Sequence, residues 1–88
     1  MNFVQTILNK RGLHARAAGK FVRIVGLFQA QITVIKGTIK ADGLSIMELL
    51  MLQASQHDIL TIEATGPESD QALQALQQLI QNKFGEHE

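Results

Sequence analysis

Four short segments of the chain are rich in β-branched and other apolar residues and are bounded by turn-forming residues, as β-strands are. They span residues 3–8, 31–35, 38–41 and 59–64. The second segment alternates polar and apolar positions, and Gly37 separates it from the third, so these two are expected to form a β-hairpin. The first segment should end at the turn Asn9-Lys10-Arg11-Gly12.

Apolar residues at helical spacing follow this turn. They form one stripe, which consists of Ala18, Phe21, Val22 and Val25. The stripe predicts an amphipathic helix that faces the sheet, with His14 as its N-cap residue and an end at about Val25. Gly26 is expected to close the helix in a left-handed conformation, with Leu27 packed back on the last turn.

A second helix is expected to begin at a capping box. Ser45 can accept a hydrogen bond from the N–H three residues on, while Glu48 can reach back to the serine's own N–H. The helix is apolar nearly all round, which is more than one buried stripe requires. Ile46, Met47 and Leu50 therefore either pack in the core or form an exposed contact patch, and the sequence favours neither.

A third helix is expected to begin near Glu68. Pro67 suits the first position of a helix, and the acidic residues Glu68 and Asp70 favour its positive end. The apolar stripe of this helix comprises Ala72, Leu73, Leu76, Leu79, Ile80 and Phe84. Residues 85–88 are expected to form a frayed tail.

The order of these elements is β-α-β-β-α-β-α. At 88 residues the chain is long enough for one modest core, so residues 1–88 are expected to form a single domain. Helices that must cover one face of a sheet predict an α+β open-faced sandwich. Ferredoxin-like ligand-sensing modules share this order through the fourth strand, so topology alone leaves the function open.

The composition excludes several classes of protein. The chain has no cysteine, which rules out disulfides and thiolate metal sites and suits a reducing cytosol. No segment approaches the roughly 20 apolar residues of a membrane helix, and the first residues lack the order of a signal peptide. These features predict a cytoplasmic protein with no membrane insertion.

Charge is sorted along the chain, although the formal net charge is +0. Every acidic residue comes at Asp42 or later, whereas five basic residues lie between Lys10 and Arg23. Such a cluster attracts anionic substrates and acidic partner surfaces. Nucleic acid is the competing ligand, but the phenylalanines occupy core-like positions and offer no stacking platform, so no nucleic-acid binding is expected.

The basic cluster surrounds His14, and the chemistry of this residue gives the main functional hypothesis. The first N–H groups of a helix have no internal partner and carry the positive end of the macrodipole, so they can receive an anion attached to His14. Arg16 adds a guanidinium that can bind two phosphate oxygens. Imidazole is nucleophilic near neutral pH, which suggests a phosphohistidine site, whereas the commoner role of such a histidine is that of a polar surface residue.

The segment Gly12-Leu13-His14-Ala15-Arg16, followed by small residues and Lys20-Phe21-Val22, resembles the active-site segment of the histidine-containing phosphocarrier protein (HPr) family of the bacterial phosphotransferase system. The likeness continues through Leu44-Ser45-Ile46-Met47 and residues 62–67, and so covers essentially the whole chain. It implies a four-stranded antiparallel sheet that is covered on one face by three helices.

The resemblance also implies a phosphoryl carrier rather than an enzyme, with no cofactor. Enzyme I, itself phosphorylated from phosphoenolpyruvate, would pass the group to the δ nitrogen of His14, and His14 would pass it to an EIIA-type acceptor protein. The N–H groups of Ala15 and Arg16 and the Arg16 side chain would hold the phosphate. Arg11 stands where many relatives carry a small polar residue and would add a second cation.

Ser45 matches a serine that a dedicated ATP-dependent kinase, the HPr kinase/phosphorylase, modifies in some bacteria. A phosphate there would place negative charge on the docking face for Enzyme I and the acceptor proteins and repel acidic partners. The resemblance assigns that docking face to Ile46, Met47 and Leu50. The basic residues Lys20 and Arg23 are expected to extend it.

Two features separate this chain from many members of the family. Ala17 stands where many have proline, which lowers the preorganisation of the first helical turn but keeps a high helix propensity, so a tuned rate is expected. Residues 62–67 and the ending Phe84-Gly85-Glu86 look more like the nitrogen-related branch of the family, NPr.

Other kinds of site find no support in the sequence. His57 and His87 are not spaced with further ligands in a metal-binding pattern, and no nucleotide-binding glycine loop is present. The alternative function is a non-covalent regulatory module. In such a module His14 only begins a helix, and the basic region holds a metabolite or an acidic protein.

Overall fold

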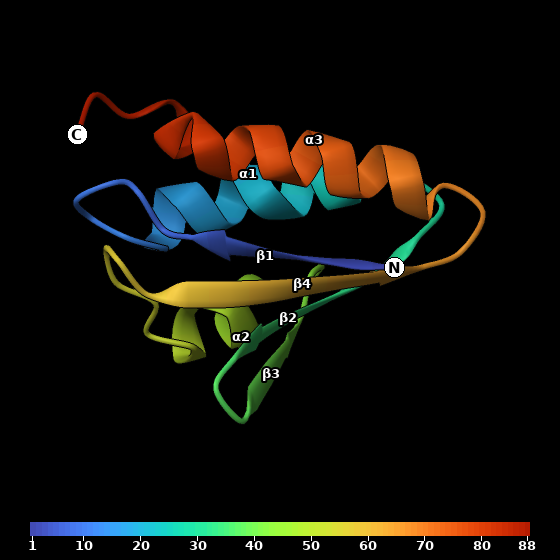
Figure 1. The fold of residues 1–88 in the computed structure, drawn as a ribbon, viewed down its shortest axis with the longest axis horizontal. Helices are drawn as coiled ribbons and strands as arrows, with labels where there is room; N and C mark the ends of the chain where they lie inside the picture. Colours follow the sequence, from blue (N-terminus) through green and yellow to red (C-terminus); the bar gives the residue numbers. More distant parts are fainter.

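A computed structural model describes residues 1–88, and its elements follow the predicted order (Figure 1). The strands are β1 (Asn2–Thr6), β2 (Gln31–Lys36), β3 (Ile39–Asp42) and β4 (Ile59–Thr65). The helices are α1 (Ala15–Val25), α2 (Ile46–Met51) and α3 (Ser69–Gln81), and a 3-10 turn, η1 (Lys83–Gly85), follows α3. None of the helices combines the length and the apolar content that crossing a membrane requires.

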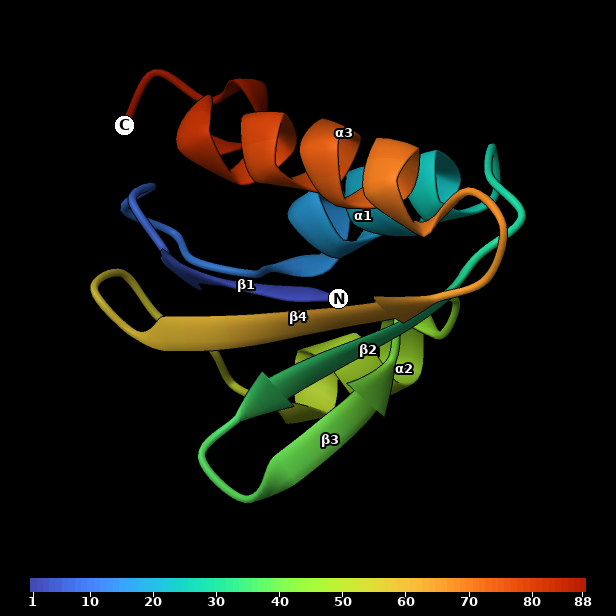
Figure 2. The same cartoon turned by 45° about the vertical axis from the view of Figure 1, so that its right-hand side comes forward.

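The four strands form one antiparallel sheet in the order β1-β4-β2-β3 (Figure 2). The predicted hairpin joins β2 to β3, where Lys36 pairs with Ile39. Gly37 turns the chain with a φ of 62°, a conformation that glycine adopts without steric cost. β1 ends at Thr6 instead of continuing to Leu8, which is exposed.

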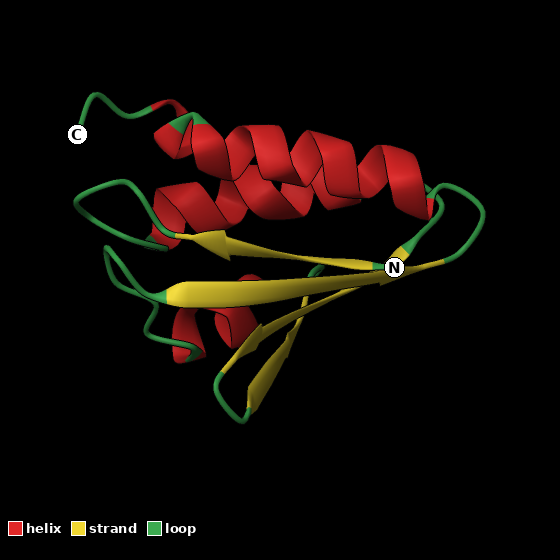
Figure 3. Ribbon diagram, in the orientation of Figure 1, coloured by secondary structure: helices red, strands yellow, loops and turns green.

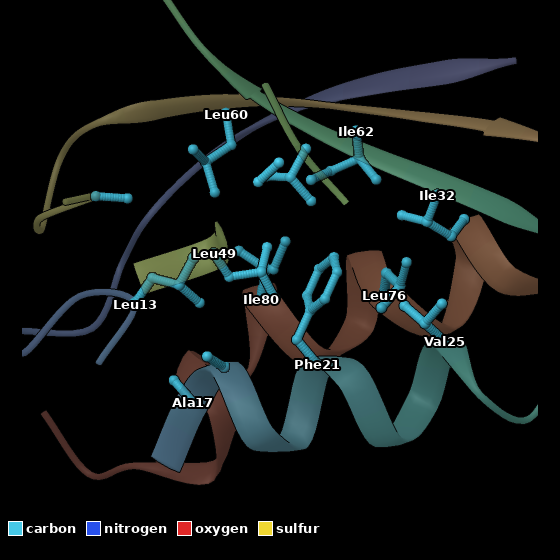
Figure 4. Packing of buried hydrophobic residues seen from close by; sticks show 14 of the residues in the cluster. Leu13, Ala17, Phe21, Val25, Ile32, Leu49, Leu60, Ile62, Leu76 and Ile80 are labelled. Carbon is cyan, nitrogen blue, oxygen red and sulfur yellow. The ribbon is translucent and has the colours of Figure 1, made fainter. Parts of the chain in front are cut away.

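Helices α1 and α3 lie side by side along the sheet (Figures 1 and 3). Helix α2 packs against α1 and β3 and places Leu49 in the same core. Figure 4 shows Phe21 of α1 and Leu76 of α3 within this core, on the side of the sheet from which Ile62 projects. The predicted fold class, an α+β open-faced sandwich, is therefore confirmed.

The end of α1 differs from the prediction. Gly26 is right-handed helical, with a φ of −65°, and Leu27 is exposed, so the predicted left-handed cap and its packed leucine are wrong. After Gly26 the backbone N–H groups instead donate to carbonyls three residues earlier. The N–H of Leu27 donates to the carbonyl of Ile24 at 3.0 Å, and the next N–H donates to that of Val25 at 3.2 Å. These shorter turns satisfy terminal carbonyls without a positive φ.

Only half of the predicted capping box forms at α2. Ser45 Oγ accepts a hydrogen bond from the Glu48 N–H at 3.1 Å, so Ser45 caps the helix as predicted. The Glu48 carboxylate does not reach back to Ser45 but accepts from the N–H of Asp42 at 2.9 Å. The Ser45 N–H is already satisfied, because it donates to the carbonyl of Asp42 at 3.0 Å.

Helix α3 begins close to the predicted position, with Glu68 as its N-cap residue. Pro67 lies in the turn before the helix rather than at its first position. The Glu68 carboxylate accepts from the N–H of Gln29 at 2.7 Å instead of capping its own helix, which fastens the loop after α1 to the start of α3. The predicted stripe is buried at Ala72, Leu73, Leu76, Ile80 and Phe84, and Leu79 is partly buried.

Candidate functional site

A fixed turn places His14 at the start of α1. Gly12 has a φ of +69° and lies against the backbone of the loop before β4, where an added Cβ would come within 2.9 Å of the Ser55 Cα. The next residue, Leu13, donates its N–H to the carbonyl of Ala54 at 2.9 Å and buries its side chain in the core. Leu13, which directly precedes His14, is thus held by a backbone hydrogen bond and by the packing of its side chain.

His14 is the N-cap residue of α1, as predicted, with φ −84° and ψ −179°. Its carbonyl accepts from the Ala18 N–H at 2.8 Å, whereas its side chain makes no capping hydrogen bond. The N–H groups of Ala15 and Arg16 have no protein acceptor. The helix start therefore presents unpaired donors and the positive end of its dipole beside the ring.

The ring of His14 is mostly buried, with 16% of its side chain exposed, and its two nitrogens have different surroundings. Nε2 contacts Oε2 of Glu86. An ionised carboxylate only accepts hydrogen bonds, so Nε2 must carry the proton. Nδ1 has no hydrogen-bond partner. It is not among the fully buried unpaired polar atoms of the side chains, since the only such atom is Oδ1 of Asn9. Nδ1 is therefore not fully buried, and in the neutral ring it holds the free lone pair.

The C-terminal segment lies at the same end of the molecule as the start of α1 (Figure 1), and Glu86 contacts His14, which contradicts the prediction of a frayed tail. Phe84 is fully buried and anchors the segment in the core. Lys20 Nζ donates to the carbonyl of Phe84 at 2.6 Å, and Glu88 lies against Lys10, whose N–H donates to the Glu88 carbonyl. The apolar stripe of α3 pointed to the burial of Phe84, but no local pattern indicated where the next residues go.

The sequence did not indicate Glu86 or Asn9 as site residues. Glu86 Oε1 accepts from Asn9 Nδ2 at 3.0 Å, while its other oxygen contacts His14. Burial, the largest single influence, would raise the pKa of Glu86, but the hydrogen bonds from His14 and Asn9 together with the charges of protonated His14 and of Arg11 outweigh it, and the pKa lies below its usual value. Glu86 is therefore a carboxylate at neutral pH.

A cleft of about 370 Å³ lies between the start of α1 and the C-terminal segment. Its lining consists of Arg11, Arg16, Lys20, Gly85, Glu86, His87 and Glu88. Neither guanidinium of this cleft forms an ion pair with a carboxylate, and both arginines are exposed. The structure thus brings the predicted cations Arg11 and Arg16 together with free charge, whereas Lys20 is occupied in holding the tail.

An exposed apolar patch lies on and just before helix α2, which packs against α1, and it includes Ile46, Met47 and Leu50, for which the sequence left core and surface open. The patch consists of Leu44, Ile46, Met47, Leu50 and Met51, all of which are exposed. Leu49 is the only buried residue of helix α2, so the other apolar residues of the helix lie on the surface and not in the core. Arg23 lies exposed in the last turn of α1.

Of the two other histidines, only His87 lines the cleft. His57 is exposed in the loop before β4, and His87 lies in the tail. No group of three or more metal-ligating side chains comes together anywhere in the chain.

Comparison with known proteins agrees with this geometry. Residues 2–82 match the model of the family described as "PTS HPr component phosphorylation site". Phosphocarrier protein HPr of Cupriavidus necator is 42% identical over 94% of this chain and 93% of that protein. Phosphocarrier protein NPr of Shewanella violacea is 42% identical over 92% of this chain and 89% of that protein. HPr-C-His from Thermoanaerobacter tengcongensis has a similar structure, with a TM-score of 0.95, 39% identity and coverage of 100% of this chain and 99% of that one.

Proposed function

The chain belongs to the HPr family of phosphocarrier proteins, and we propose that it carries a phosphoryl group on Nδ1 of His14. Members of this family act as carriers in the phosphotransferase system and are not enzymes. The observation that supports the site most directly is the free Nδ1 at the start of α1, beside the unpaired N–H groups of Ala15 and Arg16. A nucleophile and anion-binding donors thus lie together.

The proposed transfer is a displacement at phosphorus. The Nδ1 lone pair attacks the phosphorus of a phosphohistidine on the donor, the new N–P bond forms, and the bond between phosphorus and the donor nitrogen breaks. The N–H groups of Ala15 and Arg16 and the guanidinium of Arg16 hold the phosphoryl oxygens, and Arg11, which lines the same cleft as Arg16, adds a second cation. Transfer to the acceptor is the same step in reverse. No resident cofactor is needed, because the group travels covalently.

The proposed partners are Enzyme I, charged from phosphoenolpyruvate, as donor and an EIIA-type protein as acceptor. The exposed patch on helix α2 supports docking on this side of the molecule, with Ile46, Met47 and Leu50 as its apolar contacts. Flexible methionine suits a surface that must fit two partners in turn. Lys20 and Arg23 place positive charge on the neighbouring helix and favour acidic partner surfaces.

Ser45 is a proposed site of regulation by an HPr kinase/phosphorylase. It lies between Leu44 and Ile46, which are exposed members of the patch, and its hydroxyl caps helix α2. A phosphate at this helix start is compatible with the dipole but would add negative charge within the docking surface. The proposed consequence is weaker docking of acidic partners.

Intact mass spectrometry tests the central proposal. The protein is mixed with Enzyme I, magnesium and phosphoenolpyruvate, and the measurement is repeated after brief acid treatment. One acid-labile phosphate is expected on the wild-type chain and none on His14→Ala, whose fold should persist because His14 is not one of the hydrophobic residues that form the core. Full phosphorylation of the alanine variant would refute the site. No phosphate on the wild type, in a tube where a control carrier is modified, would favour a non-covalent binding module.

A further inference from the structure

The C-terminal segment places a carboxylate against the nitrogen of His14 that does not react. We propose that Glu86, held by Asn9, is a positioning residue that keeps the proton of the His14 ring on Nε2 and the lone pair on Nδ1. This inference rests on the proposed function, since it concerns how the carrier histidine is prepared for transfer. Glu86 lies beyond residues 2–82, the part of the chain that matches the family model.

The carboxylate of Glu86 uses its two oxygens on two different partners. Oε2 accepts from His14 Nε2, and Oε1 accepts from Asn9 Nδ2 at 3.0 Å. The same Asn9 nitrogen donates its second hydrogen to the carbonyl of Gly12 at 2.8 Å. The plane of the carboxylate is thereby fixed relative to the turn that carries His14, because rotation would break one of the two bonds.

Asn9 is suited to this task by its burial and its chemistry. It is fully buried, and its Oδ1 has no hydrogen-bond partner. A flipped amide would direct Oδ1 at two acceptors, the Gly12 carbonyl and the Glu86 carboxylate, so only the orientation with Nδ2 toward both is favourable. An unsatisfied buried oxygen is costly and is retained here beside the reacting residue.

The backbone on both sides of Glu86 is also held. Phe84 is buried in the core, and its carbonyl accepts from Lys20 Nζ at 2.6 Å. Gly85 turns the chain with a φ of 80°. The glutamate is therefore presented to the ring by a folded segment that bridges the core and the site.

The proposed role has an electrostatic part as well. When Nδ1 forms its bond to phosphorus, the ring keeps its proton on Nε2 and becomes positively charged. The Glu86 carboxylate faces this developing charge and stabilises it in the transition state and in the phosphohistidine. It contacts the ring at Nε2, so the phosphoryl group at Nδ1 does not displace it.

Nitrogen NMR of the His14 ring and transfer rates together test the proposal. At about pH 9, where imidazole is neutral, the wild-type ring should show its proton on Nε2. In Glu86→Ala the two tautomers should mix, and the initial rate of phosphoryl acceptance should fall by about tenfold or more. Glu86→Gln keeps one oxygen that can accept from Nε2 but removes the charge and sets an amide N–H₂ against the donor Asn9 Nδ2, so the preference for the proton on Nε2 should weaken less than in Glu86→Ala while the rate falls.

Glu63→Gln is the charge-matched control, because Glu63 is exposed on β4, outside the cleft, and its carboxylate forms no ion pair. It should leave the ring spectrum and the rate unchanged. A wild-type proton on Nδ1, or a Glu86→Ala ring spectrum like that of the wild type, would overturn the proposal. Failure of the wild-type chain to accept phosphate would instead refute the proposed function, and the ring spectrum would still decide the tautomer.

Discussion

At the scale of the residue, His14 has neighbours of two kinds, which give its ring nitrogens different surroundings. The N–H groups of Ala15 and Arg16, which have no protein acceptor, lie at the start of the helix. The Glu86 carboxylate contacts Nε2. Neutral imidazole carries one proton, so whatever binds the N–H at one nitrogen decides where the lone pair lies. The reactivity of the residue is thus set by its surroundings, since free imidazole would share both forms.

Ser45 combines a structural and an electrostatic role at one residue, and two substitutions separate them. Ser45→Ala removes the cap at the Glu48 N–H and should lower the free energy of unfolding by about 1 kcal/mol. Ser45→Asp keeps a capping oxygen, so its stability should match that of the wild type, but it adds a negative charge to the apolar patch. Urea unfolding measures the first effect.

The effect of the added charge on docking is measured as the rate of phosphoryl acceptance from Enzyme I. The rate should fall for Ser45→Asp and remain close to the wild-type value for Ser45→Ala at a temperature where both are folded. Equal rates for the two variants would show that charge at this residue does not control docking.

At the scale of the element, the turn that precedes α1 requires a glycine, Gly12, which lies outside the helix. Gly12 has a positive φ and lies against the backbone of Ala54 and Ser55. Gly12→Ala should therefore destabilise the protein by about 2–4 kcal/mol through the left-handed backbone conformation and the steric clash. Thermal and urea unfolding measure the loss.

Gly19 provides the matched comparison within the same helix. A Cβ added there meets no atom within 4 Å. Gly19→Ala should stabilise the protein by about 0.5–1 kcal/mol, because alanine loses less backbone entropy in a helix interior. A Gly12→Ala variant no less stable than Gly19→Ala would show that the entry turn does not have the conformation described.

At the scale of the whole molecule, the sequence predicted what depends on local pattern. β-prone runs placed the four strands, and apolar periodicity and the cap at Ser45 placed the three α-helices, while the short-range motif placed His14 at a helix start with Arg16 close by. Local patterns predicted less well where two acceptors compete for one N–H. The Ser45 N–H donates to the carbonyl of Asp42, so the Glu48 carboxylate accepts from the N–H of Asp42 instead. Such choices depend on how the end of a strand meets the start of a helix.

The contact between Glu86 and His14 lay further beyond sequence reasoning. The two residues are 72 positions apart, and the contact depends on where a buried phenylalanine redirects the chain after α3. No periodicity encodes which loop a tail reaches. The family resemblance did not supply the contact either, since it identified the ending of the chain only as typical of one branch.

The docked tail links the stability of the whole molecule to acid pH. Burial opposes ionisation of Glu86, but hydrogen bonds from His14 and Asn9 lower its pKa below the usual 4.5. Between that value and the lower pKa of the folded state, the unfolded chain binds more protons than the folded chain, so stability rises with pH. The contribution is fully present above about pH 4.5 and is lost as the pH falls through the folded pKa.

Urea unfolding at a series of pH values from about 7 to about 3 measures this linkage. Glu86→Gln should reduce the acid loss of stability without removing it. The N–H of Ser55 and the side chain of Lys36 also lower the pKa of Asp58, and this carboxylate contributes with the same sign. Asp58→Asn should therefore remove a separate part of the acid loss while leaving the His14 ring spectrum unchanged. If Glu86→Gln lost stability with the full slope of the wild type, the tail would not be docked in solution, and the proposed positioning of His14 would fail with it.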